Sequence, residues 1–249
     1  MTVGEPFIRY VDVHKSFGGN AVLRGVNLTI ERGLTVVVLG GSGSGKSVLL
    51  RHTIGLHRPE QGEVWVDGVE VTGLDEEDLQ DTRKKVGMLF QAGALFDSMT
   101  VYENVSFALH EHTDWDEERI LARAGEVLDY VELDGVGDLM PASLSGGMRK
   151  RVALARAIAL APRAILYDEP TTGLDPITAN TINHLIRSLQ RRLGVTSIVV
   201  THDIHSAFTV GDRIAFLHEG VIHFDGTVEE AKTSPSPLLR NFLQGGGYA

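Results

Sequence analysis

The sequence predicts an α/β protein built on a central, largely parallel sheet. Three short runs rich in β-branched and aliphatic residues have the composition of strands buried on both faces: "TVVVL" (35–39), "AILY" (164–167) and "TSIVV" (196–200). Each run is followed by a polar or glycine-rich loop and then by a helical pattern. Because strands that alternate with helices are typical of parallel sheets covered by helices, we expect the α/β class.

The other elements are expected on both sides of these core strands. Short alternating strands are predicted at 7–13 and 25–30, a hairpin around an Asp-Gly turn at 63–71, a strand at 86–90 and a last hairpin at 213–226. Helical patterns occupy 47–56, 116–131 and 149–161, and the last of these stops at Pro162. Between 92 and 162 there are few β-rich runs, so we expect a helical lobe inserted into the α/β core.

A length of 249 residues suits one large domain with a sizeable core. The tail contains two prolines and a run of three glycines, and it is expected to fray. The predicted division of the single domain 1–249 is a catalytic core (1–91 and 163–233), a helical lobe (92–162) and a short C-terminal tail (234–249).

The composition excludes several classes of function. The formal net charge is −10 and no long basic run offsets it, which argues against a nucleic-acid-binding surface. The chain has no cysteine, so disulfides, thiolate zinc sites and cysteine nucleophiles are excluded. The first 19 residues lack the pattern of a secretory signal, and no stretch approaches the ~18 uninterrupted apolar residues of a membrane helix.

The stretch "GGSGSGKS" (40–47) matches the phosphate-loop pattern G-x-x-x-x-G-K-[ST] between a predicted strand and a predicted helix. Its glycines allow the backbone to wrap closely around phosphate oxygens with N–H groups pointing inward. Lys46 is suited to reach the β- and γ-phosphates, and the Ser47 hydroxyl is suited to bind Mg²⁺. The pattern predicts a nucleotide site that uses Mg²⁺.

Polar residues follow three predicted core strands at the edge of the sheet where ligands bind in α/β proteins. Asp168 is suited to hold the Mg²⁺ shell, and Glu169 is suited to orient an attacking water. The alternative is that the two residues form a solvated acidic pair at the start of a helix. His202 follows the strand at 196–200 and could hydrogen-bond a γ-phosphate. Gln91 ends the strand at 86–90, where an amide could contact Mg²⁺ or the water, although local sequence alone does not separate it from a surface glutamine.

A second Gly-Gly pair, in "LSGGMRKR" (144–151), lies at the head of a predicted helix. Backbone N–H groups and the helix dipole favour an anion there. The chain therefore carries two loops suited to phosphate, a hundred residues apart.

Together these motifs resemble those of the ATPase subunits of ABC transporters along nearly the full chain. Residues 40–47 resemble the Walker A motif, Gln91 the Q-loop, "LSGGM" (144–148) the signature, "AILYDE" (164–169) Walker B, "GLDP" (173–176) the D-loop and His202 the switch histidine. The resemblance implies an ABC ATPase fold, which is a RecA-like core with an antiparallel β region and an inserted helical lobe. It also implies ATP and Mg²⁺ as ligands.

The resemblance also accounts for the two phosphate loops. In this family two subunits stack head to tail, and each ATP lies between the P-loop of one subunit and the signature of the other. The resemblance implies that Phe17 stacks on adenine and that Asp175 lies at the dimer seam. The other implied nucleotide-binding residues are Gly40, Gly41, Ser42, Gly43, Ser44, Gly45, Lys46, Ser47, Val48, Ser145, Gly146 and Gly147. The implied catalytic residues are Lys46, Gln91, Glu169 and His202, and the implied Mg²⁺ residues are Ser47, Gln91 and Asp168. The alternative for Phe17 is an ordinary core aromatic.

Residues 88–113, together with "LMPASLSGGM" and "DPIT", resemble the ATPases of Mla/Mce-type lipid transport systems. Met148 stands where many ABC relatives have glutamine, a substitution familiar in this branch. The resemblance implies lipid cargo, a homodimer, a polytopic permease, an Mce-domain partner and a peripheral position at the cytoplasmic face of the inner membrane. Phe96, Met99 and Tyr102 are candidates for the groove that receives the permease; the alternative is that they pack the helical lobe.

Three other interpretations remain open at the level of sequence. An importer ATPase for amino acids, ions or other small polar solutes would share the core motifs and differ after Gln91. A soluble ABC ATPase of DNA repair, chromosome maintenance or translation is disfavoured by the acidic charge, the short 48–143 interval and the single copy of each motif. A non-catalytic subunit is disfavoured by the presence of Lys46, Asp168, Glu169 and His202.

Overall fold

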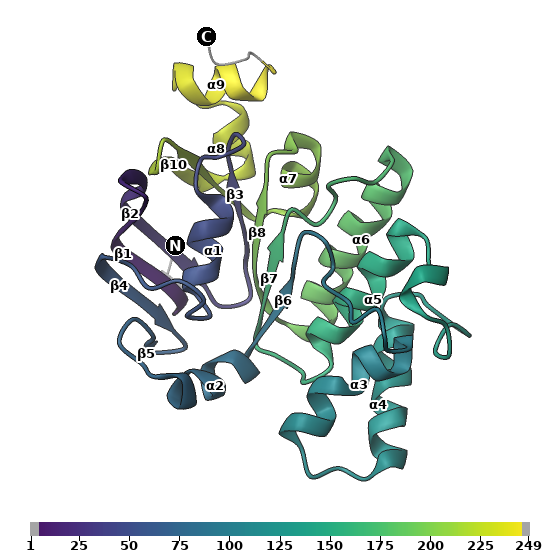
Figure 1. Cartoon of the computed structure of the whole chain (residues 1–249). Coiled ribbons are helices and arrows are strands. Elements are labelled where there is room, and N and C mark those ends of the chain that lie inside the picture. The colour runs from purple at the N-terminus through teal and green to yellow at the C-terminus, as the bar shows by residue number, and fades with distance from the viewer. Residues whose placement is uncertain (1–4, 246–249) are drawn as a thin grey trace.

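A computed structural model describes residues 5–245, in which two sheets and a group of helices lie side by side (Figure 1). In the larger sheet, parallel pairing joins all the strands except β10, which runs antiparallel to β9. The expected α/β class is therefore confirmed. In spatial order this sheet contains β10 (Val221–Thr227), β9 (Arg213–His218), β3 (Thr35–Leu39), β8 (Thr196–Thr201), β7 (Ala164–Asp168) and β6 (Val86–Leu89).

Both faces of the larger sheet are covered, which explains the uninterrupted apolar runs of its central strands. In β3, Val36 and Val38 join one buried cluster, whereas Val37 and Leu39 join another on the opposite face. All five residues of this strand are buried. Each cluster is a hydrophobic core within residues 5–245.

The smaller sheet is antiparallel and covers one face of the larger one. Its spatial order is β2 (Asn20–Glu31), β1 (Pro6–Phe17), β4 (Gln61–Val66) and β5 (Val69–Glu70). Helix α1 (Lys46–His52) lies between the two sheets, and its Leu49 and Leu50 are buried in the shared core (Figure 1). The strands expected at 7–13 and 25–30 are present but longer, because bulges let β1 and β2 pair over 12 residues each.

The two predicted hairpins form with the turn geometry that their sequences suggest. In the turn between β4 and β5, Asp67 and Gly68 have φ values of 51° and 81°. In the turn between β9 and β10, Glu219 and Gly220 have φ values of 47° and 77°. Positive φ at both central residues matches the right-handed twist of the strands that each turn connects.

Helices dominate the segment between β6 and β7. Side chains of Thr100, Asp116 and Ser145 cap α3, α4 and α5 at their N-termini. The helix expected at 149–161 begins at Gly146, inside the second glycine loop. Within residues 5–245 no helix is both long and apolar enough to cross a bilayer. The remaining helices are α2 (Glu76–Lys84), α3 (Val101–His112), α4 (Glu117–Tyr130), the 3₁₀ turn η1 (Pro141–Ser143), α5 (Gly146–Ile158), α6 (Pro176–Leu193), α7 (Ile204–Val210), α8 (Val228–Lys232) and α9 (Pro237–Leu243).

The expectation that the tail from residue 234 frays is wrong for residues 234–245. Ser236 caps α9 and Pro237 occupies its first turn, where a missing N–H costs nothing. Leu239 is fully buried, and the Phe242 ring lies 5.2 Å from that of Phe216. The prolines thus start a docked helix, and residues 246–249 lie outside the described part.

His52, at the end of α1, should make stability depend on pH. Burial lowers its pKa to about 4, while Nδ1 lies 2.7 Å from the Val48 carbonyl oxygen. Between pH 6.5 and pH 4 the unfolded chain therefore binds a proton that the folded chain does not, so stability falls as pH falls through this window. Between pH 7.5 and pH 5 we expect the free energy of unfolding of His52→Met to fall by about 2 kcal/mol less than that of the wild type. Urea unfolding at the two pH values measures this difference.

The exposed His205 provides the matched control for this prediction. His205→Gln should lose as much stability as the wild type between the same two pH values. An equal loss in wild type and His52→Met would show that His52 does not carry this part of the pH dependence.

Candidate functional site

The loop between β3 and α1 needs glycine at the positions where the sequence supplies it. Gly43 and Gly45 have φ values of 78° and 101°, which strain other residues. A Cβ at Gly40 would lie 2.2 Å from the Leu217 carbonyl oxygen, whereas one at Gly43 would meet nothing within 4 Å. The loop therefore packs closely against the sheet on one side and faces open space on the other, as a phosphate-binding loop requires.

The Lys46 side chain is buried within this loop and surrounded by oxygen atoms. Its Nζ donates to the carbonyl oxygens of Gly40 and Gly41, both at 2.9 Å, and lies 3.4 Å from Glu169 Oε1. Burial lowers the pKa of Lys46, and the carboxylates of Glu169 and Asp168 oppose that shift. A cation held in this way is positioned to bind phosphate oxygens at the mouth of the loop.

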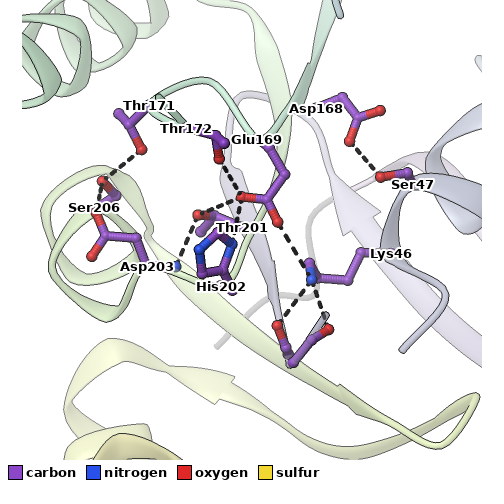
Figure 2. A network of polar contacts seen from close by, with 12 residues as sticks. Lys46, Ser47, Asp168, Glu169, Thr171, Thr172, Thr201, His202, Asp203 and Ser206 are labelled. Carbon is purple, nitrogen blue, oxygen red and sulfur yellow. Dashed lines mark hydrogen bonds and ion pairs between the residues drawn. The ribbon is translucent and has the colours of Figure 1, made fainter. Parts of the chain in front are cut away.

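Ser47 and Asp168 bring two hard oxygen ligands together, although they lie far apart in the sequence. The Ser47 hydroxyl donates to Asp168 Oδ1 at 2.6 Å, and Asp168 is almost completely buried (Figure 2). Mg²⁺ prefers a hydroxyl, one or two carboxylates and water to an all-protein cage. Ser47 and Asp168 therefore fit Mg²⁺, and the exposed Gln91 lines a cavity together with Ser47.

Glu169 has an unusual backbone conformation directly after β7. Its φ is 48°, and its N–H donates to the Val200 carbonyl at 2.9 Å. A left-handed, non-glycine residue costs about 1–3 kcal/mol and is a frequent mark of a functional site. This conformation places the carboxylate between Lys46 and His202, as Figure 2 shows.

One carboxylate oxygen of Glu169 accepts from three side chains. Thr172 Oγ1, Thr201 Oγ1 and His202 Nδ1 lie 3.2, 3.4 and 2.9 Å from Oε2 (Figure 2). His202 is about half exposed, so its ring is open to a ligand. Sequence reasoning found Glu169 and His202 but missed both threonines, which their positions beside the motif residues could have suggested.

A second layer of hydrogen bonds supports the loop that follows β8. Asp203 accepts from the Ser206 hydroxyl at 2.6 Å, and Ser206 lies 3.3 Å from the Thr171 hydroxyl. The buried Asn183 of α6 donates to Ser206 Oγ at 2.9 Å. This network links α6, α7 and the segment after Glu169.

Lys46, Glu169 and His202 line a cavity of about 290 Å³ at the carboxyl edge of the sheet. No residue of the second glycine loop, 144–148, lines it. Val22, from β2, is a lining residue that sequence reasoning did not identify, and no motif signals it. The lining residues are Val22, Ser42, Gly43, Gly45, Lys46, Ser47, Val48, Gln91, Glu169 and His202.

The second glycine loop forms the N-terminus of α5. The Ser145 hydroxyl accepts from the Met148 N–H at 3.2 Å and so caps the helix. Gly146 is exposed, and a Cβ there would meet only Leu174 at an ordinary 3.6 Å. At Gly147 a Cβ would lie 2.5 Å from Thr178 Cγ2, so close packing against α6 requires this glycine.

Asp175 and Phe17 lie outside the lining of the cavity. Asp175 caps α6 by accepting from the N–H groups of Ile177 and Thr178, and the Thr178 hydroxyl holds its pKa below the usual range. Phe17 ends β1 with 43% of its surface exposed, and its ring contacts that of His57. This exposure does not fit the core position that was the alternative for Phe17.

The three candidate groove residues have different environments. Phe96 is 42% exposed and lies 5.0 Å from the Phe107 ring. Met99 is half-buried, and Tyr102 packs so closely on Gly137 that a Cβ there would lie 2.0 Å from its ring. Tyr102 therefore packs the lobe, whereas Phe96 is available to a partner.

Comparisons with known proteins agree with this geometry. Residues 23–172 match the family described as ABC transporter. The chain is 42% identical to the probable ribonucleotide transport ATP-binding protein mkl of Mycobacterium tuberculosis (strain ATCC 25618 / H37Rv) over 231 residues, which cover 93% of this chain and 64% of that protein. It is 39% identical to the intermembrane phospholipid transport system ATP-binding protein MlaF of Escherichia coli (strain K12), covering 94% of this chain and 87% of that protein.

A solved structure has the same fold. It is described as the dimeric structure of a post-hydrolysis state of an ATP-binding cassette bound to ADP and Pi. The TM-score is 0.82 at 36% sequence identity, and the match covers 89% of this chain and 98% of that chain.

Proposed function

The chain belongs to the ABC transporter family, and from this premise we propose that it is the ATP-hydrolysing subunit that powers a separate membrane permease. The observation that carries the proposal is the convergence of Lys46, Ser47, Asp168, Glu169 and His202 at one edge of the sheet. Lys46 and Ser47 begin α1 after the loop that follows β3, and the other three lie at or directly after the ends of β7 and β8. Their arrangement suits phosphoryl transfer, which depends mainly on positioning and charge stabilisation.

Each of these groups has a role that follows from its contacts. Lys46 exchanges its carbonyl partners for phosphate oxygens and stabilises their charge. Glu169, fixed by Thr172 and Thr201, orients the attacking water, and His202 donates to the transferred phosphate. Ser47 and Asp168, with Gln91 beside them, hold Mg²⁺, which neutralises phosphate charge when bound.

The working unit is proposed to be a homodimer with two ATP sites. The cavity at the P-loop has no lining residue from 144–148, so one chain contains two half-sites. A head-to-tail partner supplies Ser145, Gly146 and Gly147 to the ATP of the first chain. Phe17 of the first chain stacks on the adenine, and Asp175 lies at the seam between the two chains. The dimeric relative bound to ADP and Pi supports this arrangement.

The cargo is proposed to be phospholipid or a related lipid, moved by an Mla/Mce-type system. The similarity to MlaF over 94% of this chain supports this proposal. Such a system adds a polytopic permease and an Mce-domain lipid-binding protein, and it holds the ATPase at the cytoplasmic face of the inner membrane. The second candidate is a small polar solute, because the mycobacterial relative is described as a probable ribonucleotide transport ATP-binding protein.

Purification of the full chain from its native membranes in mild detergent distinguishes these candidates. Co-purification of a polytopic permease, an Mce-domain protein and bound phospholipid would support the lipid proposal. A permease with a nucleotide-binding or other polar-solute partner would replace the cargo but keep the ATPase role. Purification without any membrane protein would contradict the transport proposal.

Phe96→Asp should release the chain from its permease while leaving ATP binding intact. The side chain is exposed, and Asn104 holds the backbone of the loop by accepting from the Phe96 N–H and donating to its carbonyl, at 2.8 and 3.0 Å. A charge placed in a buried interface costs 2 kcal/mol or more, roughly a thirtyfold loss of affinity. Co-purification with the permease and binding of a fluorescent ATP analogue measure the two effects.

Leu121→Asp is the matched control, because Leu121 is an exposed aliphatic residue elsewhere in the helical lobe, on α4. It should retain both the permease and ATP. If Phe96→Asp instead lost soluble folding, the side chain would serve packing of the lobe rather than docking.

A further inference from the structure

A buried lysine joins the helix that begins with the second glycine loop to the loop that carries Gln91. Lys150 lies on α5 with only 7% of its surface exposed, and its Nζ donates to the Gln91 carbonyl oxygen. Burial lowers the pKa of Lys150, and the carboxylates of Asp168 and Glu169 oppose that shift. The ammonium thus points from α5 toward the edge of the sheet where the catalytic carboxylates lie.

The rest of the loop after β6 is also held on α5 through its backbone. Arg156 donates to the carbonyl oxygens of Gly93 and Ala94, at 2.9 and 2.6 Å. A Cβ on Gly93 would lie 3.6 Å from Ala153, so the loop packs directly on the helix surface. A movement of α5 must therefore carry residues 91–94 with it.

The two ends of this contact belong to different ATP sites. Gln91 lines the cavity formed by the P-loop of its own chain. Ser145 and Gly146, at the start of α5, face the ATP of the partner chain under the proposed function. Lys150 lies little more than one helical turn after Gly146. Its contact with the Gln91 carbonyl is how α5 holds Gln91.

We propose that Lys150 is a positioning residue that couples the two ATP sites of the dimer. When the start of α5 engages the partner's ATP, Lys150 moves the Gln91 peptide with the helix and brings the Gln91 amide into its own site. Occupation of one site then favours hydrolysis at the other. This inference rests on the proposed function, because it requires a dimer with two shared sites.

The neighbouring Arg151 is a cation on α5 whose hydrogen bonds stay within the helical lobe. Its guanidinium donates to the carbonyl oxygen of Glu132 at 2.8 Å and to that of Val131. Both acceptors lie at the end of α4, so this contact joins parts of the helical lobe only. Arg151→Met is therefore the matched control for Lys150→Met.

The test measures ATP hydrolysis by the purified full chain as a function of ATP concentration, together with thermal unfolding. We expect Lys150→Met to lower kcat roughly three- to thirtyfold. The Hill coefficient should fall from about 2 toward 1, with a smaller change in the affinity of the isolated chain for ATP. Lys150→Arg, which keeps a cation and donors, should restore both kcat and cooperativity.

Arg151→Met should lower the unfolding temperature but keep kcat and the Hill coefficient close to those of the wild type. An unchanged Hill coefficient in Lys150→Met, or the same loss in Arg151→Met, would overturn the inference. If Lys150→Met does not fold, Lys150→Leu, which likewise removes the donor to the Gln91 carbonyl, is the substitute and should show the same losses. An inactive wild type would instead overturn the proposed function, and the inference with it.

Discussion

Glu169→Gln should lower ATP turnover by about 10²–10⁴-fold while leaving ATP bound, because it removes the carboxylate that orients and polarises the attacking water. The amide has nearly the shape of the carboxylate and can still accept from Thr172 and Thr201. Loss of the negative charge 3.4 Å from Lys46 leaves that cation freer to bind phosphate. The variant should therefore accumulate as an ATP-bound dimer.

Phosphate release and light scattering measure the two parts of this prediction. Glu219→Gln is the matched control, because Glu219 is also a left-handed glutamate, with φ 47° against 48° for Glu169, but is exposed in the β9–β10 turn. It should hydrolyse ATP at the wild-type rate and form no trapped dimer. Unchanged phosphate release by Glu169→Gln would remove Glu169 from its assigned role.

Much of the fold could be predicted because it depends on short-range patterns. Aliphatic runs identified the three central strands, and the Asp67-Gly68 pair identified a hairpin turn. The docked α9 could not be predicted, because two prolines in a short tail suggest a break as readily as a helix start. Only burial of Leu239 against the core decides between them.

In the candidate site, too, the sequence identified the motif residues but not the features that depend on contacts between distant segments. The type and order of the motif residues identified Lys46, Ser47 and Asp168, and strand ends predicted that they would meet. The left-handed backbone of Glu169 could not be predicted, because it depends on its N–H reaching Val200 of the neighbouring strand. Lys150 was missed because its partner is a backbone carbonyl, and a carbonyl leaves no signal in the sequence.

Gly146→Asp should abolish ATP hydrolysis without lowering the stability of the chain. A Cβ at this position meets Leu174 at an ordinary 3.6 Å, and an acidic residue in the first turn of α5 interacts favourably with the helix dipole by about 0.3–1 kcal/mol. The same negative charge would face the γ-phosphate of the partner's ATP. We therefore expect a loss of at least about 10²-fold in turnover, with an unchanged or raised unfolding temperature.

Gly125→Asp is the matched control, because Gly125 lies on α4, an added Cβ there would meet nothing within 4 Å, and the residue belongs to no phosphate loop. It should keep full ATPase activity. Full activity in Gly146→Asp would show that the second glycine loop does not contact phosphate.

Mixing Gly146→Asp with Lys46→Ala should restore one nucleotide site per mixed dimer, although each variant alone is inactive. Lys46→Ala loses the cation of its own P-loop but keeps an intact 144–148 loop. In a mixed dimer that loop completes the P-loop of the Gly146→Asp chain, while the other site carries both defects. Random pairing makes half of the dimers mixed with one intact site each, so about a quarter of the wild-type sites return.

The recovered sites are best counted as ATP occluded in the Glu169→Gln background, because occlusion does not depend on cooperation between sites during turnover. Absence of occluded ATP in the mixture would mean that the two glycine loops do not share a nucleotide across two chains. Recovery, in contrast, requires one ATP to contact two chains. That result would explain why a single chain carries two phosphate loops, of which only the first lines the cavity that contains Lys46.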